Sequence, residues 1–215
     1  MPFSSQFLPT GDGRMTAEPA ALEAHLARRR YGRFTLTEAI RPGWPLEVVP
    51  RAGYRHDTFV DAQGDRLPAL VAAVTSENLF DTFLDVLEPI GDVCDVILET
   101  AHDRPQGGHV DLIRHGIERT VLESVLWEFD DVLLDDGCTG IAVMHPERPL
   151  EVQFDAHKLL VVYAPDTTPF ERVLRTRGVP ADDAIRFLFQ AEHVHASHTR
   201  FARRFEELAA RLAAE

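Results

Sequence analysis

The sequence predicts an α+β fold in which helices cover a mainly antiparallel sheet. Strand-like segments gather in two places, as a hairpin in the N-terminal part of the chain and as a three-stranded meander in its C-terminal part. Segments whose apolar residues recur at the helical period surround them, and the last of these predicts a long C-terminal helix. The chain contains no internal repeat and no long linker, so a single layered domain accounts for it.

The N-terminal part predicts an arm followed by a helix. Prolines and glycines interrupt residues 1–15, which indicates a flexible arm, and residues 16–215 then form the single α+β domain. Thr16 is a suitable N-cap for a helix over 17–30, because an acidic residue and a proline suit its first turn and arginines suit its last.

The next segments predict strands and one helix. An alternating pattern over 33–40 favours a strand, and residues 55–62 and 66–75 predict a β-hairpin around the turn AQGD. Helical spacing follows over 77–88, and the largely apolar run 92–101 predicts a buried strand.

Residues 111–134 predict one long amphipathic helix. Apolar residues repeat there every four positions, and Asp111 stands where an N-cap is expected. Gly116 falls inside this helix, where it lowers the helical propensity without removing the apolar stripe.

The C-terminal part predicts the meander and two further helices. The turn-forming sequences PERP and DAHK separate its three strands, which cover 138–145, 149–154 and 159–164. A helix over 168–178 ends at Gly178, and helical spacing then continues through 180–213.

Composition and charge exclude several classes of protein. No apolar run approaches the roughly 18–20 residues that span a bilayer, and the N-terminus lacks the pattern of a signal peptide. We therefore expect a soluble, cytoplasmic protein with no membrane partner. The formal net charge of −13 repels a phosphate backbone, so nucleic acid is not an expected partner either. The single lysine and abundant alanine are typical of a GC-rich bacterial genome.

The two cysteines, Cys94 and Cys138, predict free thiols in a reducing compartment. They are far apart and form no CxxC motif. Cys138 follows a glycine at a strand entrance, where a thiol can act as a nucleophile. However, Asp135 and Asp136 beside it would raise the pKa of the thiol, so we expect Cys138 to pack as a small apolar residue.

Three histidines stand within six residues near the C-terminus, in the sequence AEHVHASHTRF. On an unbroken helix His195 and His198 share one face with Glu192, whereas His193 points more than about 120° away. A metal needs three or four ligands, so this geometry excludes a site made by the three histidines alone. His195 and His198 remain candidate ligands if another segment supplies the rest.

A second set of polar residues surrounds the predicted loop 99–111. Histidine with carboxylate can bind a divalent metal that activates water, or can act as a general acid and base. The candidate ligands in this loop are Glu99, His102, Asp103 and His109. The alternative is structural, because caps, turns and strand ends also require such residues.

Two functional hypotheses remain open. The first is a cytoplasmic binding or regulatory protein without catalytic activity, whose acidic surface meets a basic protein partner; its candidate contacts are Asp135, Asp136, Glu151 and Asp155. The second is a metal-assisted hydrolase or metal-binding protein that uses the 99–111 loop, with a divalent metal as its cofactor. A third option is a small-ligand binding protein, with a small molecule as its partner and its pocket between the sheet and the helices. No phosphate-binding loop, GxSxG elbow or HExxH helix is present to decide between them.

Overall fold

The computed structural model describes residues 19–60, 64, 66–102 and 110–214, so the predicted arm at 1–15 and the Thr16 cap lie outside the described residues. The described chain confirms the α+β class. Its main element is a seven-stranded sheet in which every neighbouring pair of strands is antiparallel. In spatial order the strands are β4 (Gly53–Val60), β5 (Arg66–Ala73), β10 (Leu159–Tyr163), β9 (Glu151–Phe154), β8 (Thr139–Met144), β6 (Val93–Thr100) and β7 (Val110–Glu118).

The predicted layout, an antiparallel sheet made of an N-terminal hairpin plus a three-stranded meander, is wrong because β6 and β7 also belong to the sheet, which has seven strands. Strands are present where both were expected, but β5 pairs with β10 along its length, from Leu159 opposite Ala73 to Tyr163 opposite Ala69. Both strands are apolar on both faces, as their continuous buried runs show. Pairing them buries these faces and removes two edges that would otherwise be exposed.

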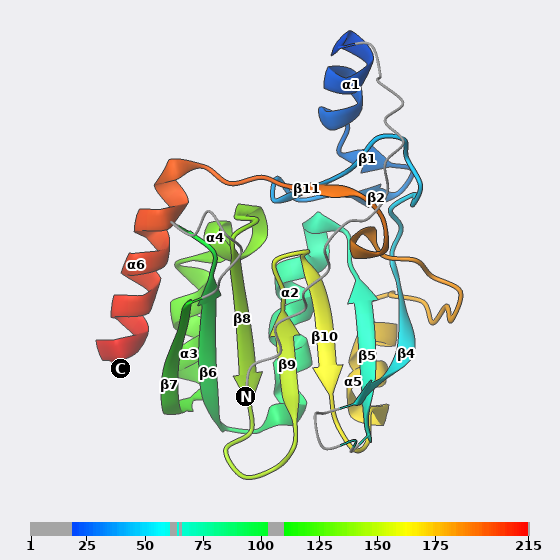
Figure 1. Ribbon diagram of the computed structural model, residues 1–215. Helices are drawn as coiled ribbons and strands as arrows, with labels where there is room; N and C mark the ends of the chain where they lie inside the picture. Colours follow the sequence, from blue (N-terminus) through cyan, green and yellow to red (C-terminus); the bar gives the residue numbers. More distant parts are fainter. Residues whose placement is uncertain (1–18, 61–63, 65, 103–109, 215) are drawn as a thin grey trace.

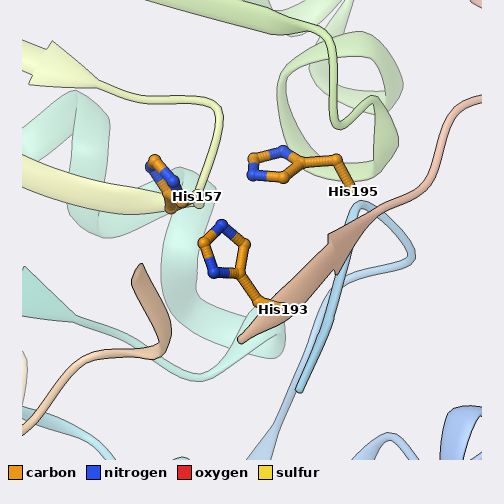
Figure 2. A group of neighbouring side chains, drawn as sticks. All are labelled: His157, His193 and His195. Atoms are coloured by element: carbon orange, nitrogen blue, oxygen red, sulfur yellow. The ribbon is translucent and has the colours of Figure 1, made fainter. Parts of the chain in front are cut away.

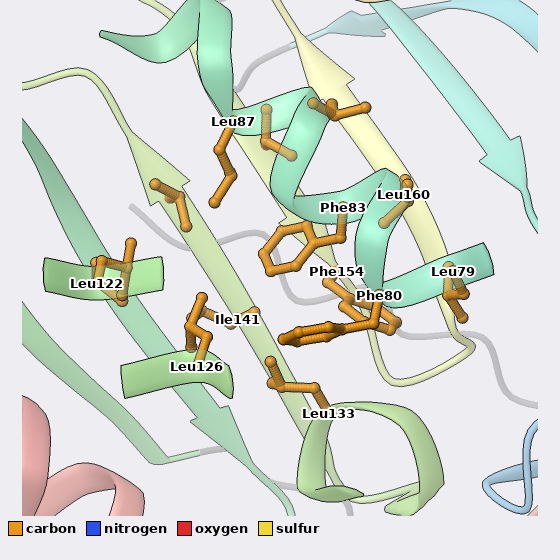
Figure 3. Close-up of a cluster of buried hydrophobic side chains, with 14 of the residues drawn as sticks. Leu79, Phe80, Phe83, Leu87, Leu122, Leu126, Leu133, Ile141, Phe154 and Leu160 are labelled. Carbon is orange, nitrogen blue, oxygen red and sulfur yellow. The ribbon is translucent and has the colours of Figure 1, made fainter. Parts of the chain in front are cut away.

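Helices cover one face of the sheet (Figure 1). The core beneath them is formed by alternate strand residues, including Ile141, Phe154 and Leu160, which meet Phe83 and Leu126 from the helices (Figure 3). All five of these side chains are almost completely buried. The helices that contribute to this core are α2 (Ser76–Leu87), α3 (Arg119–Trp127), α4 (Asp130–Asp135), α5 (Thr168–Thr176) and α6 (Thr199–Ala214).

Short elements cover part of the opposite face. The strands β1 (Arg30–Tyr31) and β2 (Phe34–Thr35) form one small sheet, and β3 (Ile40–Pro42) pairs with β11 (His193–His195) in another. They enclose a second, smaller core with apolar residues of β5 and β10. The remaining elements are α1 (Pro19–Leu26), η1 (Glu88–Ile90) and η2 (Leu188–Gln190).

Two of the predicted helices are wrong in part. The segment 111–134 begins as strand β7, in which Asp111 pairs with Glu99 instead of capping a helix, and Gly116 adopts a left-handed φ of 65°. A helix cannot continue through that conformation, whereas a bulged strand can: the pairing shifts between Cys94 and Val96 of β6, where β7 contains one extra residue. The segment 180–213 is α-helical only from Thr199, because Leu188–Gln190 form the short 3-10 helix η2 and His193–His195 pair with β3 as strand β11.

The other predicted elements are present with small changes of length. The helix expected over 17–30 is observed as α1, and the strand expected over 33–40 is reduced to β2 and the first residue of β3. The helix α5 ends as expected near Gly178, whose φ is 75°. Among the described residues no helix is long and apolar enough to cross a membrane.

Candidate metal centre

Three histidines from two distant segments converge beside the small β3–β11 sheet. His193 and His195 lie on β11, and His157 lies in the turn between β9 and β10 (Figure 2). The ring centroids are 5.0 Å apart for His157 and His193, 4.8 Å for His157 and His195, and 5.1 Å for His193 and His195. One nitrogen from each ring lies within 4.8 Å of the other two. We call these three residues the histidine trio.

Each ring of the trio is held through its Nδ1 atom. The Nδ1 of His193 donates to the carbonyl of Ala191 at 2.8 Å, and the Nδ1 of His195 donates to the carbonyl of Gly137 at 2.8 Å. Carbonyl oxygens only accept, so these bonds assign the ring proton to Nδ1.

The ring of His157 is also held by a hydrogen bond from its Nδ1 atom. The Nδ1 of His157 is 3.0 Å from Oδ2 of Asp155, and a carboxylate likewise accepts the Nδ1 proton. In the neutral form every ring of the trio therefore keeps a free lone pair on Nε2. Fixing the tautomer in this way is what outer partners do for metal-binding histidines.

The strand conformation of β11 brings His193 and His195 together. Side chains two apart on a strand share a face, so both rings lie on one side and Val194 lies on the other. Pairing with β3 places His193 opposite Pro42 and His195 opposite Ile40. The prediction that backbone geometry separates His193 from His195 is therefore wrong, because it assumed an unbroken helix.

Two glycines hold the ends of β11. Gly43 donates its backbone N–H to the carbonyl of Glu192 at 2.7 Å, and Gly137 donates its own to the carbonyl of Ala196 at 2.8 Å. A Cβ atom on Gly137 would lie 2.6 Å from the carbonyl oxygen of Ala39 and 2.7 Å from that of Ala196. Neither contact has room for a side chain, so glycine is required where this loop meets β11.

The turn that carries His157 is fixed by its own residues. Asp155 accepts the backbone N–H of Leu159 at 2.8 Å through Oδ1, while Oδ2 accepts from His157. Lys158 adopts a left-handed φ of 61°, and its buried Nζ donates to the carbonyl of Thr139 on β8 at 2.9 Å. A non-glycine residue in this conformation is strained, and the surrounding bonds hold it there.

The electrostatics of the trio favour neutral imidazole at His195. Desolvation and the neighbouring His157 lower the pKa of His195 to about 4, so this ring carries no charge at neutral pH. Burial opposes the charged form of His157, but the hydrogen bond and charge of Asp155 raise its pKa. Burial likewise opposes ionisation of Asp155, yet the hydrogen bond from His157 lowers the pKa of that carboxyl group.

The structure distributes the predicted metal ligands among different places. Of these residues only His195 belongs to the trio. His198 precedes α6, where its carbonyl accepts the N–H of Phe201 at 2.8 Å. His102 is 2.8 Å from Asp136, in a separate cluster. Asp103 and His109 lie outside the described residues.

Glu99 lies on the face of the sheet opposite the helices, since its neighbours Leu98 and Thr100 are buried toward them. Burial and then the charge of Asp111 raise the pKa of Glu99 to about 7. Glu151 and Asp155 add smaller effects in the same direction.

The four carboxylates expected to meet a basic partner all have partners within the chain. Asp135 accepts the backbone N–H of Glu38 at 2.9 Å, and Glu151 accepts from the side chain of Gln153 at 2.5 Å. Asp136 is completely buried, and Asp155 is bound to His157 and to the backbone of its turn. This surface therefore offers a basic partner less free charge than the sequence suggests.

Comparisons with protein-family models, with curated proteins and with solved structures find no match for this chain. The candidate centre therefore has to be interpreted from its own geometry. Sequence reasoning missed His157 and His193. The usable signal was the HxH spacing, which directs two imidazoles to one side when the segment is extended.

Proposed function

We propose that this chain binds a divalent transition-metal ion through the Nε2 atoms of His157, His193 and His195. The observation that carries the proposal is that all three Nδ1 atoms have acceptors within the chain while the rings face one another at about 5 Å. Three histidines are a ligand set of catalytic zinc sites, in which the fourth position is left to water or substrate.

The partial exposure of the trio supports a role beyond structure. His157 and His193 are half-buried and His195 is exposed, so an ion bound between them can be reached from solvent. Three neutral ligands leave the ion its full charge, which lowers the pKa of a bound water molecule and polarises carbonyl or phosphoryl groups. We therefore favour metal-assisted hydrolysis as the activity of this centre. A divalent metal is also the cofactor expected from the sequence. The ligands proposed for it, however, are those of the trio and not the residues of the 99–111 loop.

The other parts of the proposal rest on composition. Cys94 and Cys138 are both free thiols, which supports a reducing, cytoplasmic compartment. The net charge of −13 supports a partner other than nucleic acid. A regulatory protein without activity is the second candidate, and it is favoured only if the trio takes up no metal.

The proposal is tested by metal analysis of untagged protein and by titration of the metal-free chain with Zn²⁺. We expect one ion at the trio. His157→Ala, His193→Ala and His195→Ala should each weaken binding at that site by more than about 100-fold. This exceeds the 10–100-fold typical for loss of an outer partner, because a direct ligand is removed.

His198→Ala is the matched control, since His198 is close in sequence but outside the trio. It should leave the affinity for Zn²⁺ unchanged. Failure of the unmodified chain to bind Zn²⁺, or equal loss in His193→Ala and His198→Ala, would contradict the proposal.

A further inference from the structure

A second group of metal-ligating side chains lies next to the trio. His102 follows β6, while Asp136 and Cys138 belong to the loop between α4 and β8. One ligand atom from each of these three residues lies within 4.8 Å of the other two. Gly137, whose carbonyl orients His195, stands between Asp136 and Cys138, so one short loop serves both groups.

Asp136 is the central member of this group. Its side chain has no exposed surface, and burying a carboxylate is costly unless it is neutralised and hydrogen-bonded. Its Oδ2 atom is 2.8 Å from Nε2 of His102 and accepts the hydroxyl of Thr139 at 2.5 Å, while Oδ1 accepts the N–H of Cys138 at 3.2 Å. The chain thus holds a buried carboxyl group at a fixed point beside an imidazole and a thiol.

The surroundings of Cys138 do not fit a cysteine nucleophile activated by histidine. Such a nucleophile needs a lowered pKa, whereas burial and then the charge of Asp136 raise the pKa of the Cys138 thiol. The charge of Lys158 lowers the pKa of this thiol, but burial and Asp136 outweigh it. A nitrogen, a carboxylate oxygen and a sulfur gathered around one point are instead a ligand set for zinc.

We propose that His102, Asp136 and Cys138 form a second metal site, selective for a thiophilic divalent ion of the zinc class. This site is independent of the trio and differs from it in charge, because a carboxylate and a thiolate nearly neutralise the ion. His102 is 14% exposed and Cys138 is half-buried, so solvent reaches the group.

Binding of an ion at this second site releases protons in a defined number. The proton that Nε2 of His102 shares with Asp136 moves to Nδ1, which leaves a lone pair on Nε2 for the ion. The proton on the sulfur of Cys138 is released to solvent, and Asp136 contributes without losing a proton. One proton is therefore released for each ion that enters this site.

Cobalt distinguishes the two sites because only one of them contains sulfur. Saturating the metal-free full-length chain with Co²⁺ should produce a near-ultraviolet thiolate-to-cobalt absorption band. Cys138→Ser should abolish this band while the visible cobalt absorption of the trio persists. His193→Ala should have the opposite effect, with loss of the trio's contribution and retention of the thiolate band.

Two controls address thiol identity and folding. Cys94→Ala removes the other, buried cysteine and should leave the band intact. His102→Ala keeps both thiols and should weaken Co²⁺ at the sulfur site by more than about 100-fold, with an unchanged far-ultraviolet circular dichroism spectrum. Absence of the thiolate band in the saturated, unmodified chain, or its loss in Cys94→Ala, would overturn the proposal without affecting the trio.

Discussion

Of the three Nδ1 acceptors of the trio, Asp155 is the one that acts through its side chain, so a substitution there can test the proposed metal site. As a carboxylate it accepts the Nδ1 proton of His157 and keeps the Nε2 lone pair free. In Asp155→Asn the amide N–H₂ can face Nδ1 instead, which favours the tautomer with its proton on Nε2. We expect this substitution to weaken Zn²⁺ binding by about 10–100-fold in calorimetric titration.

Asp95 provides a matched control for Asp155. Its Oδ2 atom accepts from Nδ1 of His115 at 2.9 Å, which is the same carboxylate–imidazole arrangement at a site remote in sequence from the trio. Asp95→Asn should leave Zn²⁺ affinity unchanged. An equal loss of affinity in the two variants would show that charge alone is responsible.

Glu99 predicts a pH dependence of stability in the metal-free chain. Burial and the neighbouring carboxylates raise its pKa from 4.5 to about 7, so the folded chain favours the protonated form. The resulting stabilisation is complete below about pH 4.5 and is lost as the pH rises to about 7. Glu99→Gln keeps the neutral shape, so it should be more stable than the unmodified chain at about pH 8 and equal to it at about pH 4.

The size of this effect is about 1–2 kcal/mol, which is less than the full pKa shift implies because Glu99 is only partly buried. Thermal unfolding at the two pH values measures it. Glu147→Gln, on the exposed loop between β8 and β9, makes the same change of charge and should show no such difference. An identical response in both variants would assign the effect to net charge.

At the scale of elements, β11 depends on glycine at the loop that meets its C-terminal end. Gly137→Ala would place a Cβ atom 2.6 Å from the carbonyl oxygen of Ala39, so either β11 or the loop must move. We expect a loss of about 1–3 kcal/mol in the free energy of unfolding. Because the carbonyl of Gly137 orients His195, Zn²⁺ affinity should fall in the same variant.

Gly140→Ala is the control that tests whether alanine at another glycine close to Gly137 in the sequence also lowers stability and Zn²⁺ affinity. Its Cβ atom would meet ordinary contacts, the nearest being 3.4 Å from the flexible side chain of Glu99. Denaturant unfolding and Zn²⁺ titration should therefore show little change. If Gly137→Ala were equally well tolerated, the close approach at β11 would not be essential.

Elements that combine regular apolar spacing with turn-forming residues at their ends could be predicted from the sequence. The helix α2 and the strands of the meander have clear spacing and are bounded by turn residues. The segments that became β7 and β11 could not, because their apolar spacing also fits a helix and their strand partners are distant in sequence. Pairing with β6 and β3 decides their conformation, and such tertiary contacts override local preference.

The candidate site was predictable only in part for the same reason. The sequence indicates that His195 is a candidate ligand, but the residues that meet it depend on the backbone at 193–195 and on a turn at 155–158. Nothing near His157 in the sequence indicates that this turn meets β11. A site assembled across a sheet is visible only after the sheet order is known.

At the scale of the whole molecule, metal binding should stabilise the fold by mass action. Zn²⁺ at about 100 times its dissociation constant contributes about 2.7 kcal/mol if the unfolded chain does not bind it. For a chain of this length that corresponds to a rise in Tm of about 5–10 °C. Differential scanning calorimetry should show this rise, its reversal by a chelator and its reduction in His157→Ala. An undiminished rise in that variant would place the stabilising ion elsewhere.

The shortness of β11 has a consequence for how fast an ion can be exchanged. This strand has three residues, pairs only with β3 among the described strands and lies outside the seven-stranded sheet. Short segments outside the main sheet can open locally at a fraction of the free energy of global unfolding. If β11 separated from β3, His193 and His195 would leave the ion together while the seven-stranded sheet stayed intact. We therefore expect the rate at which a bound ion leaves to follow the rate of amide hydrogen exchange at 193–196. Local opening of β11 would then set how fast the ion exchanges.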